Sequence, residues 1–283
     1  MLNKLTDRIY YMDYVQQGDR PVLGLVVGDK YSLVIDGGNS KSHAEEFLRY
    51  ASKLDIPHLK YLTLTHWHWD HVFGMETLSL INIVSKESNE KLVWMETLDW
   101  SDSAIDERVN NGEEIDFCRE HIKIEHPNKD RSFIIPKADI VYKDELTIDL
   151  GSVQVEIKNI PCDHSRGSSI INIPTEKVTF LGDALYLDMY NGEWSYSKEL
   201  FYPLLDELES YDSNYYIPAH HDKYNNKEFK EFVKYQKNLG KLVGDSIILK
   251  EVEEKFNDKY NRLPDEDELE DLKGYVEGNK KKK

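Results

Sequence analysis

Cysteine is scarce in this chain. Cys118 and Cys162 are the only two among 283 residues. Two cysteines are too few for a disulfide framework, and these two lie too far apart for a cysteine-rich structural zinc site. This scarcity favours a reducing compartment, so we predict a cytoplasmic protein.

Long apolar runs are also missing. The N-terminal stretch MLNKLTDRIYYMDYVQQ lacks the apolar core of a secretory signal. No later run approaches the roughly 20 apolar residues of a membrane span. We therefore expect no membrane partner.

Positive charge is in deficit. The chain has 36 Lys and Arg against 53 Asp and Glu, a formal net charge of −17. This balance repels phosphate backbones and anionic membranes, so we expect a small-molecule substrate and no nucleic acid. With 40% hydrophobic residues the chain can close a large core, which excludes global disorder. The sequence is compatible with a homo-oligomer but does not specify one.

Strand-like and helix-like segments alternate along the chain. Segments rich in β-branched and aromatic residues predict strands, several of them in the first quarter, one at residues 61–65 and others in the middle of the chain. Two of these strands end in an aspartate, Asp36 and Asp183. Ser42 and Glu45 have the spacing of a capping box, which predicts a helix starting there.

Two further regions have a weaker or terminal pattern. Residues 85–145 are mainly helical in character and are expected to form a lid or a substrate wall. A helical extension is predicted for residues 226–283. The basic run at residues 280–283 is expected to be disordered.

The densest polar cluster of the chain is HWHWDH, directly after the strand-like run at 61–65. It supplies four potential ligands within six residues, His66, His68, Asp70 and His71. Imidazole with carboxylate suits divalent metals such as zinc. Histidines that merely pack would bury several polar groups without partners, and structural zinc sites are usually rich in cysteine. We therefore predict a catalytic metal site.

Motifs along the chain resemble those of the metallo-β-lactamase superfamily. THWHWDH is similar to its H-x-H-x-D-H signature, and PCDHSRGS, TFLGDALY and YYIPAHH follow in the order of its later motifs. LVIDGG resembles the family's opening strand. The resemblance implies an α+β fold, the four-layer αββα sandwich, as a catalytic domain over residues 1–225.

The resemblance also implies the ligands of two metal ions. One metal would be held by His66, His68 and His164, the other by Asp70, His71 and His220, and Asp183 would bridge them. Two Zn²⁺ per chain are expected, although iron or manganese could use the same ligands.

Two motifs depart from the family's usual pattern. The third reads Cys162-Asp163-His164 where the family often has Pro-Gly-His. Asp163 could fix the tautomer of an imidazole or face solvent in a turn. The fifth ends in His220-His221, and alignment of Pro218 with the family's proline places the ligand at His220 and His221 near the pocket rim.

The implied activity is metal-dependent hydrolysis of a small ester, thioester or lactone by a metal-bridged hydroxide. Asp70 could also orient that hydroxide or relay its proton. Tyr186 has the spacing from Asp183 found in the resembling quorum-quenching lactonases, where a tyrosine hydroxyl assists at the scissile carbonyl. Tyr186 could instead be a wall residue, and Tyr190 is a second candidate for the same role.

Other activities remain open at this point. The main alternative is a mononuclear iron oxygenase of the persulfide-dioxygenase type. Hydrolysis of a small phosphodiester and a non-catalytic metal-binding module are further alternatives. Trp67, Trp69 and Trp194 could line the substrate site or belong to the core.

Overall fold

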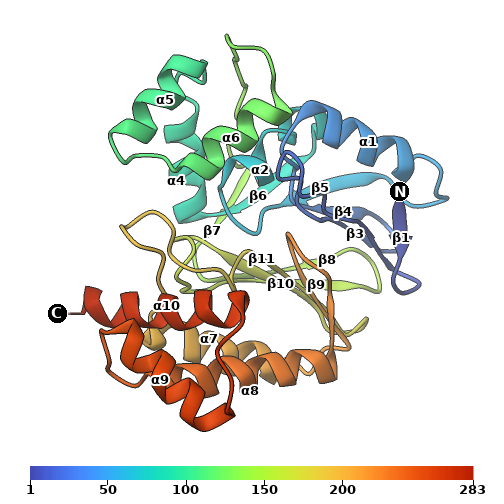
Figure 1. Cartoon of the computed structure of the whole chain (residues 1–283). Helices are drawn as coiled ribbons and strands as arrows, with labels where there is room; N and C mark the ends of the chain where they lie inside the picture. The colour runs from blue at the N-terminus through green and yellow to red at the C-terminus, as the bar shows by residue number, and fades with distance from the viewer. Residues whose placement is uncertain (283) are drawn as a thin grey trace.

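Two β-sheets lie face to face between two layers of helices in the computed structural model, which describes residues 1–282 (Figure 1). The first sheet has seven strands in sequence order. They are β1 (Leu2–Lys4), β2 (Ile9–Met12), β3 (Leu23–Val27), β4 (Ser32–Ile35), β5 (Leu59–Thr63), β6 (Ile81–Ser85) and β7 (Ile140–Tyr142). Strands β1 to β4 pair antiparallel, and β4 to β7 pair parallel.

The second sheet has six strands in the order β13-β12-β11-β10-β9-β8. They are β8 (Glu145–Asp149), β9 (Gln154–Asn159), β10 (Ser169–Ile173), β11 (Val178–Gly182), β12 (Tyr215–Pro218) and β13 (Tyr224–Asn225). Only the pair β11 and β12 is parallel among the described strands of this sheet. Each sheet thus contains parallel strands whose carboxyl ends meet at the same edge.

Helices cover the outer face of each sheet (Figure 1). Those of the first half are α1 (Lys41–Ala51), α2 (Trp69–Val72), α3 (Met75–Leu78), α4 (Lys86–Met95), α5 (Asp102–Asn110) and α6 (Asp116–Glu125). Those of the second half are α7 (Lys198–Ser210), α8 (Asn226–Val243), α9 (Leu249–Tyr260) and α10 (Glu266–Lys281). Among the described residues, no helix is long and apolar enough to cross a membrane.

The core between the sheets explains why the two sheets pack face to face. Apolar side chains of the first sheet, including Leu33 and Ile35, meet Ile171 and Phe180 of the second in one buried cluster. Strands β3, β4, β10 and β11 are buried at every position, as expected for strands covered on both faces. The predicted αββα sandwich is confirmed.

Two local predictions are wrong. Helix α1 is capped by Ser40, whose side chain accepts a hydrogen bond from the His43 backbone N–H, and not by Ser42. The basic terminus is not disordered at Lys280 and Lys281, because α10 continues to Lys281. Lys283 lies outside the described residues.

Candidate metal centre

The candidate ligands lie where parallel strands end. Strand β4 stops just before Asp36, and β5 leads through Thr65 into His66. In the second sheet β11 stops just before Asp183, and β12 leads into His220. Because the carboxyl ends of parallel strands share one edge, each sheet delivers its polar side chains to one place. The two edges face each other, and the loop between β9 and β10 adds His164.

All seven predicted ligands come together in two groups. Within each group, one candidate ligand atom per residue lies within 4.8 Å of the others. The first group is His66, His68 and His164, and the second is Asp70, His71, Asp183 and His220. Six of the seven side chains are buried, and His220 is half-buried.

The first group has the properties of neutral electron-pair donors. His68 Nδ1 and His164 Nε2 lie 2.9 Å apart. His66 Nε2 is buried with no hydrogen-bond partner among the described residues. Burial, with His164 beside it, lowers the pKa of His68 to about 3, and burial with His71 nearby lowers the pKa of His66 well below its usual range. These rings therefore stay uncharged at neutral pH and can offer lone pairs to a cation.

Asp183 links the two groups. Its Oδ2 lies 3.4 Å from His164 Nε2 and 3.6 Å from the Nε2 atoms of three other histidines, namely His66, His71 and His220. These distances exceed those of good hydrogen bonds, and Asp183 Oδ1 is buried without a partner among the described residues. Carboxylate and imidazole atoms that converge at this spacing fit a cation between them. The donor set therefore fits a metal cofactor.

Asp70 completes the second group. Its Oδ2 lies 3.0 Å from His71 Nε2 and 3.1 Å from His220 Nε2.

Asp183 carries a negative charge. Burial alone would raise the pKa of Asp183, but His220 and His71 outweigh it and hold that pKa well below its usual range. Asp183 is therefore a carboxylate at any physiological pH and carries negative charge into the centre.

Two further carboxylates orient the ligand rings from behind. Asp36 Oδ2 lies 2.9 Å from His71 Nδ1 and Asp19 Oδ1 lies 3.2 Å from His220 Nδ1. With a metal ion bound at Nε2, a carboxylate at Nδ1 would keep the proton there and hold the ring in its orientation. Asp36 is itself held by Thr65, whose backbone N–H and hydroxyl donate to it at 2.7 and 2.8 Å.

Sequence reasoning assigned no role to these two carboxylates. For Asp36 a signal existed in the sequence, because it directly follows a strand-like apolar segment, as Asp183 does. In the structure it takes a left-handed conformation with φ 65°. Asp19 reaches His220 only through the fold, and no local pattern marks it. Burial raises the pKa of Asp19 to about 7, although His220 opposes that rise.

A cavity of about 250 Å³ adjoins the two ligand groups. Tyr186 lines it, with its ring centre 5.9 Å from that of His164 and 6.3 Å from that of His220. Burial raises the pKa of Tyr186 above its usual range, so its hydroxyl keeps a proton that it can donate. Tyr190 also lines the cavity, but its hydroxyl donates to Glu114 Oε1 at 2.9 Å.

The structure places the remaining candidates as follows. Asp163 is half-buried in a bend, and its Oδ2 accepts a hydrogen bond from the Ser197 N–H at the start of α7 rather than from an imidazole. His221 packs 6.0 Å from the Tyr186 ring and is not among the grouped ligand atoms. Trp69 and Trp194 line the cavity, whereas Trp67 packs against Trp94 and His68.

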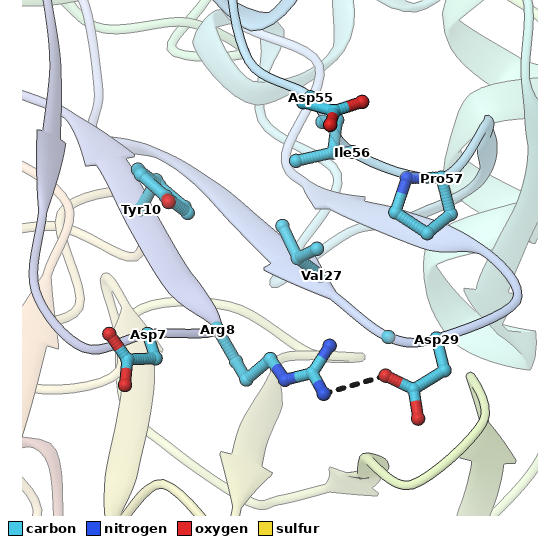
Figure 2. Close-up of a pocket in the computed structure, with 9 residues that line it drawn as sticks. Asp7, Arg8, Tyr10, Val27, Asp29, Asp55, Ile56 and Pro57 are labelled. Carbon is cyan, nitrogen blue, oxygen red and sulfur yellow. Dashed lines mark hydrogen bonds and ion pairs between the residues drawn. The ribbon is translucent and has the colours of Figure 1, made fainter.

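A second, wider hollow of about 720 Å³ lies at the opposite ends of the same strands (Figure 2). Its lining includes Arg8, Asp29 and Pro57, and the Arg8 guanidinium is paired with Asp29 at 2.6 Å. None of the candidate metal ligands lines it. The candidate metal centre therefore adjoins the smaller cavity.

The sequence profile of the Metallo-beta-lactamase superfamily matches residues 19–220, a range that includes all seven candidate ligands. A search of curated protein sequences finds no match.

Several solved structures share the fold. A metallo-beta-lactamase from Pontibacter korlensis is 16% identical, with a TM-score of 0.54 over 83% of this chain and 97% of its own. A metallo-beta-lactamase family protein from Thermus thermophilus is 15% identical, with a TM-score of 0.58 over 98% and 93%.

A stereoselective inverting sec-alkylsulfatase from Pseudomonas sp. is 13% identical, with a TM-score of 0.65 over 98% of this chain. This chain spans only 48% of that sulfatase. At these identities the likenesses show the fold alone. Because the family profile covers most of the chain and its ordered motifs, the protein belongs to the metallo-beta-lactamase superfamily.

Proposed function

We propose that the protein is a hydrolase with two Zn²⁺ ions per chain that cleaves a small ester, thioester or lactone. The observation that carries this proposal is the position of Asp183, one carboxylate oxygen of which lies between two complete ligand groups. A shared carboxylate suits a pair of ions better than a single one.

Bound there, a pair of zinc ions would supply an activated water near neutral pH and polarise the oxygen of the scissile bond. The residues of the chain would divide the remaining work. His66, His68 and His164 would hold one ion, Asp70, His71 and His220 the other, and Asp183 both. Asp36 and Asp19 would keep the rings of His71 and His220 in the orientation that binding requires.

Proton movement would fall to Asp70 and Tyr186. Asp70 faces the centre from the second group, so it can orient the attacking oxygen and accept its proton. Tyr186 lines the cavity beside both groups and remains protonated. Its hydroxyl would donate to the oxygen on which negative charge develops.

The first test is the metal content of protein purified without added metal, together with turnover of a panel of small esters, thioesters and lactones. About two zinc ions per chain with hydrolysis of panel members supports the proposal. About one iron per chain with oxygen uptake would replace it by an oxygenase. An absence of bound metal under metal-replete conditions would overturn the metal centre itself.

An Asp70→Asn variant tests the proposed role of Asp70 as proton acceptor. The amide keeps the shape of the side chain but cannot accept the proton, so we expect turnover to fall about 100-fold or more. The variant is informative only with its metal content measured beside it. Full turnover with full metal content would remove Asp70 from the chemistry.

The substrate is expected to be a small molecule in a reducing, cytoplasmic setting. Cys118 and Cys162 are both buried and free, which supports the expectation drawn from their low number.

A further inference from the structure

The walls of the cavity beyond the ligands are largely apolar. Ile115 and Phe117 approach from the start of α6, and Leu187, Met189 and Trp194 approach from the loop that follows β11. Phe117 and Trp194 are 39% and 40% exposed, so apolar surface remains open beside the metal centre. A group that fills this space gains by removing that surface from water.

The two walls are tied together from behind. Tyr190, from the loop, donates to Glu114 at 2.9 Å and lies 3.3 Å from Cys118 Sγ on α6. Its ring centre is 5.5 Å from that of His68. The apolar walls are therefore fixed relative to the ligands, and the space between them is preformed.

The charged side chains that line the cavity outside the ligand set are acidic. They are Asp19 and Glu270 among the described residues. Glu270 lies on α10, beyond the region that the family profile matches, and its side chain is exposed at the cavity's edge. A negative group entering past Glu270 meets like charge close by, whereas a neutral group meets none of that repulsion.

Helix α10 is held firmly against the loop that carries one wall. The Tyr196 N–H donates to the Gly274 carbonyl at 3.0 Å. Lys273 pairs with Glu193 at 2.9 Å and Lys281 with Asp188 at 3.0 Å. These contacts fix the backbone of α10 against the loop, so the exposed Glu270 side chain stays at the entrance of the cavity that Leu187 and Trp194 also line.

We propose that α10 completes the substrate pocket and that the pocket selects substrates in which the group beside the scissile bond is apolar and uncharged. Through Glu270 it disfavours substrates that carry a negative charge at that place. This inference rests on the proposed function, because it names the class of substrate that the same centre would cleave.

Binding of two matched anilides tests the inference without requiring turnover. Hexananilide and adipic acid monoanilide have the same chain length, and only the second ends in a carboxylate. Titration of the zinc-loaded protein, followed by the change in its tryptophan fluorescence, gives both dissociation constants, because Trp69 and Trp194 line the cavity. We expect the neutral compound to bind about tenfold more tightly.

A Glu270→Lys variant identifies the source of that preference. Reversing the charge should reduce the ratio of the two dissociation constants about three- to tenfold. This reduction should be smaller in high salt. Glu266→Lys is the matched control, since Glu266 is exposed on the same helix and does not line the cavity. It makes the same change in net charge and should leave the preference unchanged.

Each result bears on the inference. Equal binding of the two anilides, or a preference that Glu270→Lys leaves intact, overturns it. Hydrolysis of p-nitrophenyl hexanoate, together with the ester, thioester and lactone panel, tests the proposed function separately. If the metal-loaded protein cleaves none of these compounds, the proposed function is refuted. The binding preference between the two anilides is measured without turnover and is judged by itself.

Discussion

At the residue scale, the centre depends on the candidate ligands and equally on the neighbouring residues that orient them. His71 is held between Asp36 on one ring nitrogen and Asp70 on the other. Gly182, with φ 52°, brings Asp183 close to the first sheet, since a Cβ there would lie 2.5 Å from Thr65. Any larger residue at 182 would push the two strand ends apart and move Asp183 with them.

Tyr186→Phe should lower kcat on the true substrate by about 10- to 100-fold and leave the metal content unchanged. The phenyl ring preserves packing against His164 but removes the donor for the developing negative charge. Tyr31→Phe is the control, because Tyr31 precedes β4 at the end remote from the centre. Unchanged kcat in Tyr186→Phe would leave Tyr186 a wall residue.

Asp271 makes the stability of the fold depend on pH. It accepts a hydrogen bond from Gln236 Nε2 at 2.9 Å, and burial raises its pKa to about 6. The folded chain therefore binds the proton more tightly than the unfolded chain, whose pKa is near the ordinary 3.8. The free energy of unfolding therefore falls as the pH rises from 3.8 to about 6. Above the pKa of the folded state this loss of stability is complete.

Asp271→Asn should consequently raise the melting temperature at pH 7.5, by a stabilisation on the order of 2 kcal/mol. The amide oxygen can still accept the bond from Gln236 without carrying a buried charge. The gain should shrink as the pH is lowered toward 4. A gain of equal size at both pH values would mean that charge is not its cause.

Local sequence patterns marked four of the candidate ligands, and the family resemblance implied the other three, but neither predicted the residues that support them. His66, His68, Asp70 and His71 lie within six residues of the chain, whereas His164, Asp183 and His220 were carried over from the family's later motifs. Glu114 and Tyr190 are 76 positions apart, and Asp19 meets His220 from the other end of the domain. Such contacts depend on the packing of the two sheets, which local patterns do not contain.

At the element scale, tertiary contacts override local capping signals. Ser42 had the better capping spacing, but it lies inside α1, where its hydroxyl accepts a hydrogen bond from Arg20 at 3.0 Å and donates one to Glu125 at 3.2 Å. Ser40 caps α1 in its place. The terminal lysines were expected to be disordered because charge runs usually are. Instead Asn279 donates to the carbonyls of Gly244 and Ser246 and anchors the end of α10.

Gly278→Ala should destabilise the protein by about 1–3 kcal/mol, although Gly to Ala inside a helix ordinarily stabilises by roughly 1 kcal/mol. The reason is that a Cβ at 278 would lie 1.9 Å from the Tyr196 carbonyl oxygen. Thermal unfolding measures the change. Lys280→Ala, at an exposed position of α10, is the control, and a stabilised Gly278→Ala would contradict the close packing of α10 on the loop.

At the scale of the whole molecule, the centre joins the two halves of the sandwich. His66, His68, Asp70 and His71 follow a strand of the first sheet, whereas His164, Asp183 and His220 come from the second. Metal binding therefore adds a bond between sheets that otherwise meet through apolar packing.

Removal of metal with EDTA should accordingly lower the melting temperature, on the order of 5 °C or more, because a ligand that binds only the folded chain stabilises it. Added Zn²⁺ should restore the original value. EDTA already saturated with zinc is the control for effects of the chelator itself. A melting temperature that is the same with and without metal would show that metal binding does not stabilise the packing of the two sheets.

The arrival of His220 so late in the chain has a consequence for biosynthesis. When the first half of the chain has left the ribosome, the candidate ligands His66, His68, Asp70 and His71 are present without His164, Asp183 and His220, which lie in the second half. Such a partial chain could capture a metal ion in the wrong geometry and would be unable to use it. Correct loading thus requires the chain through His220, so termination anywhere between His71 and His220 would leave the first ligands without their partners.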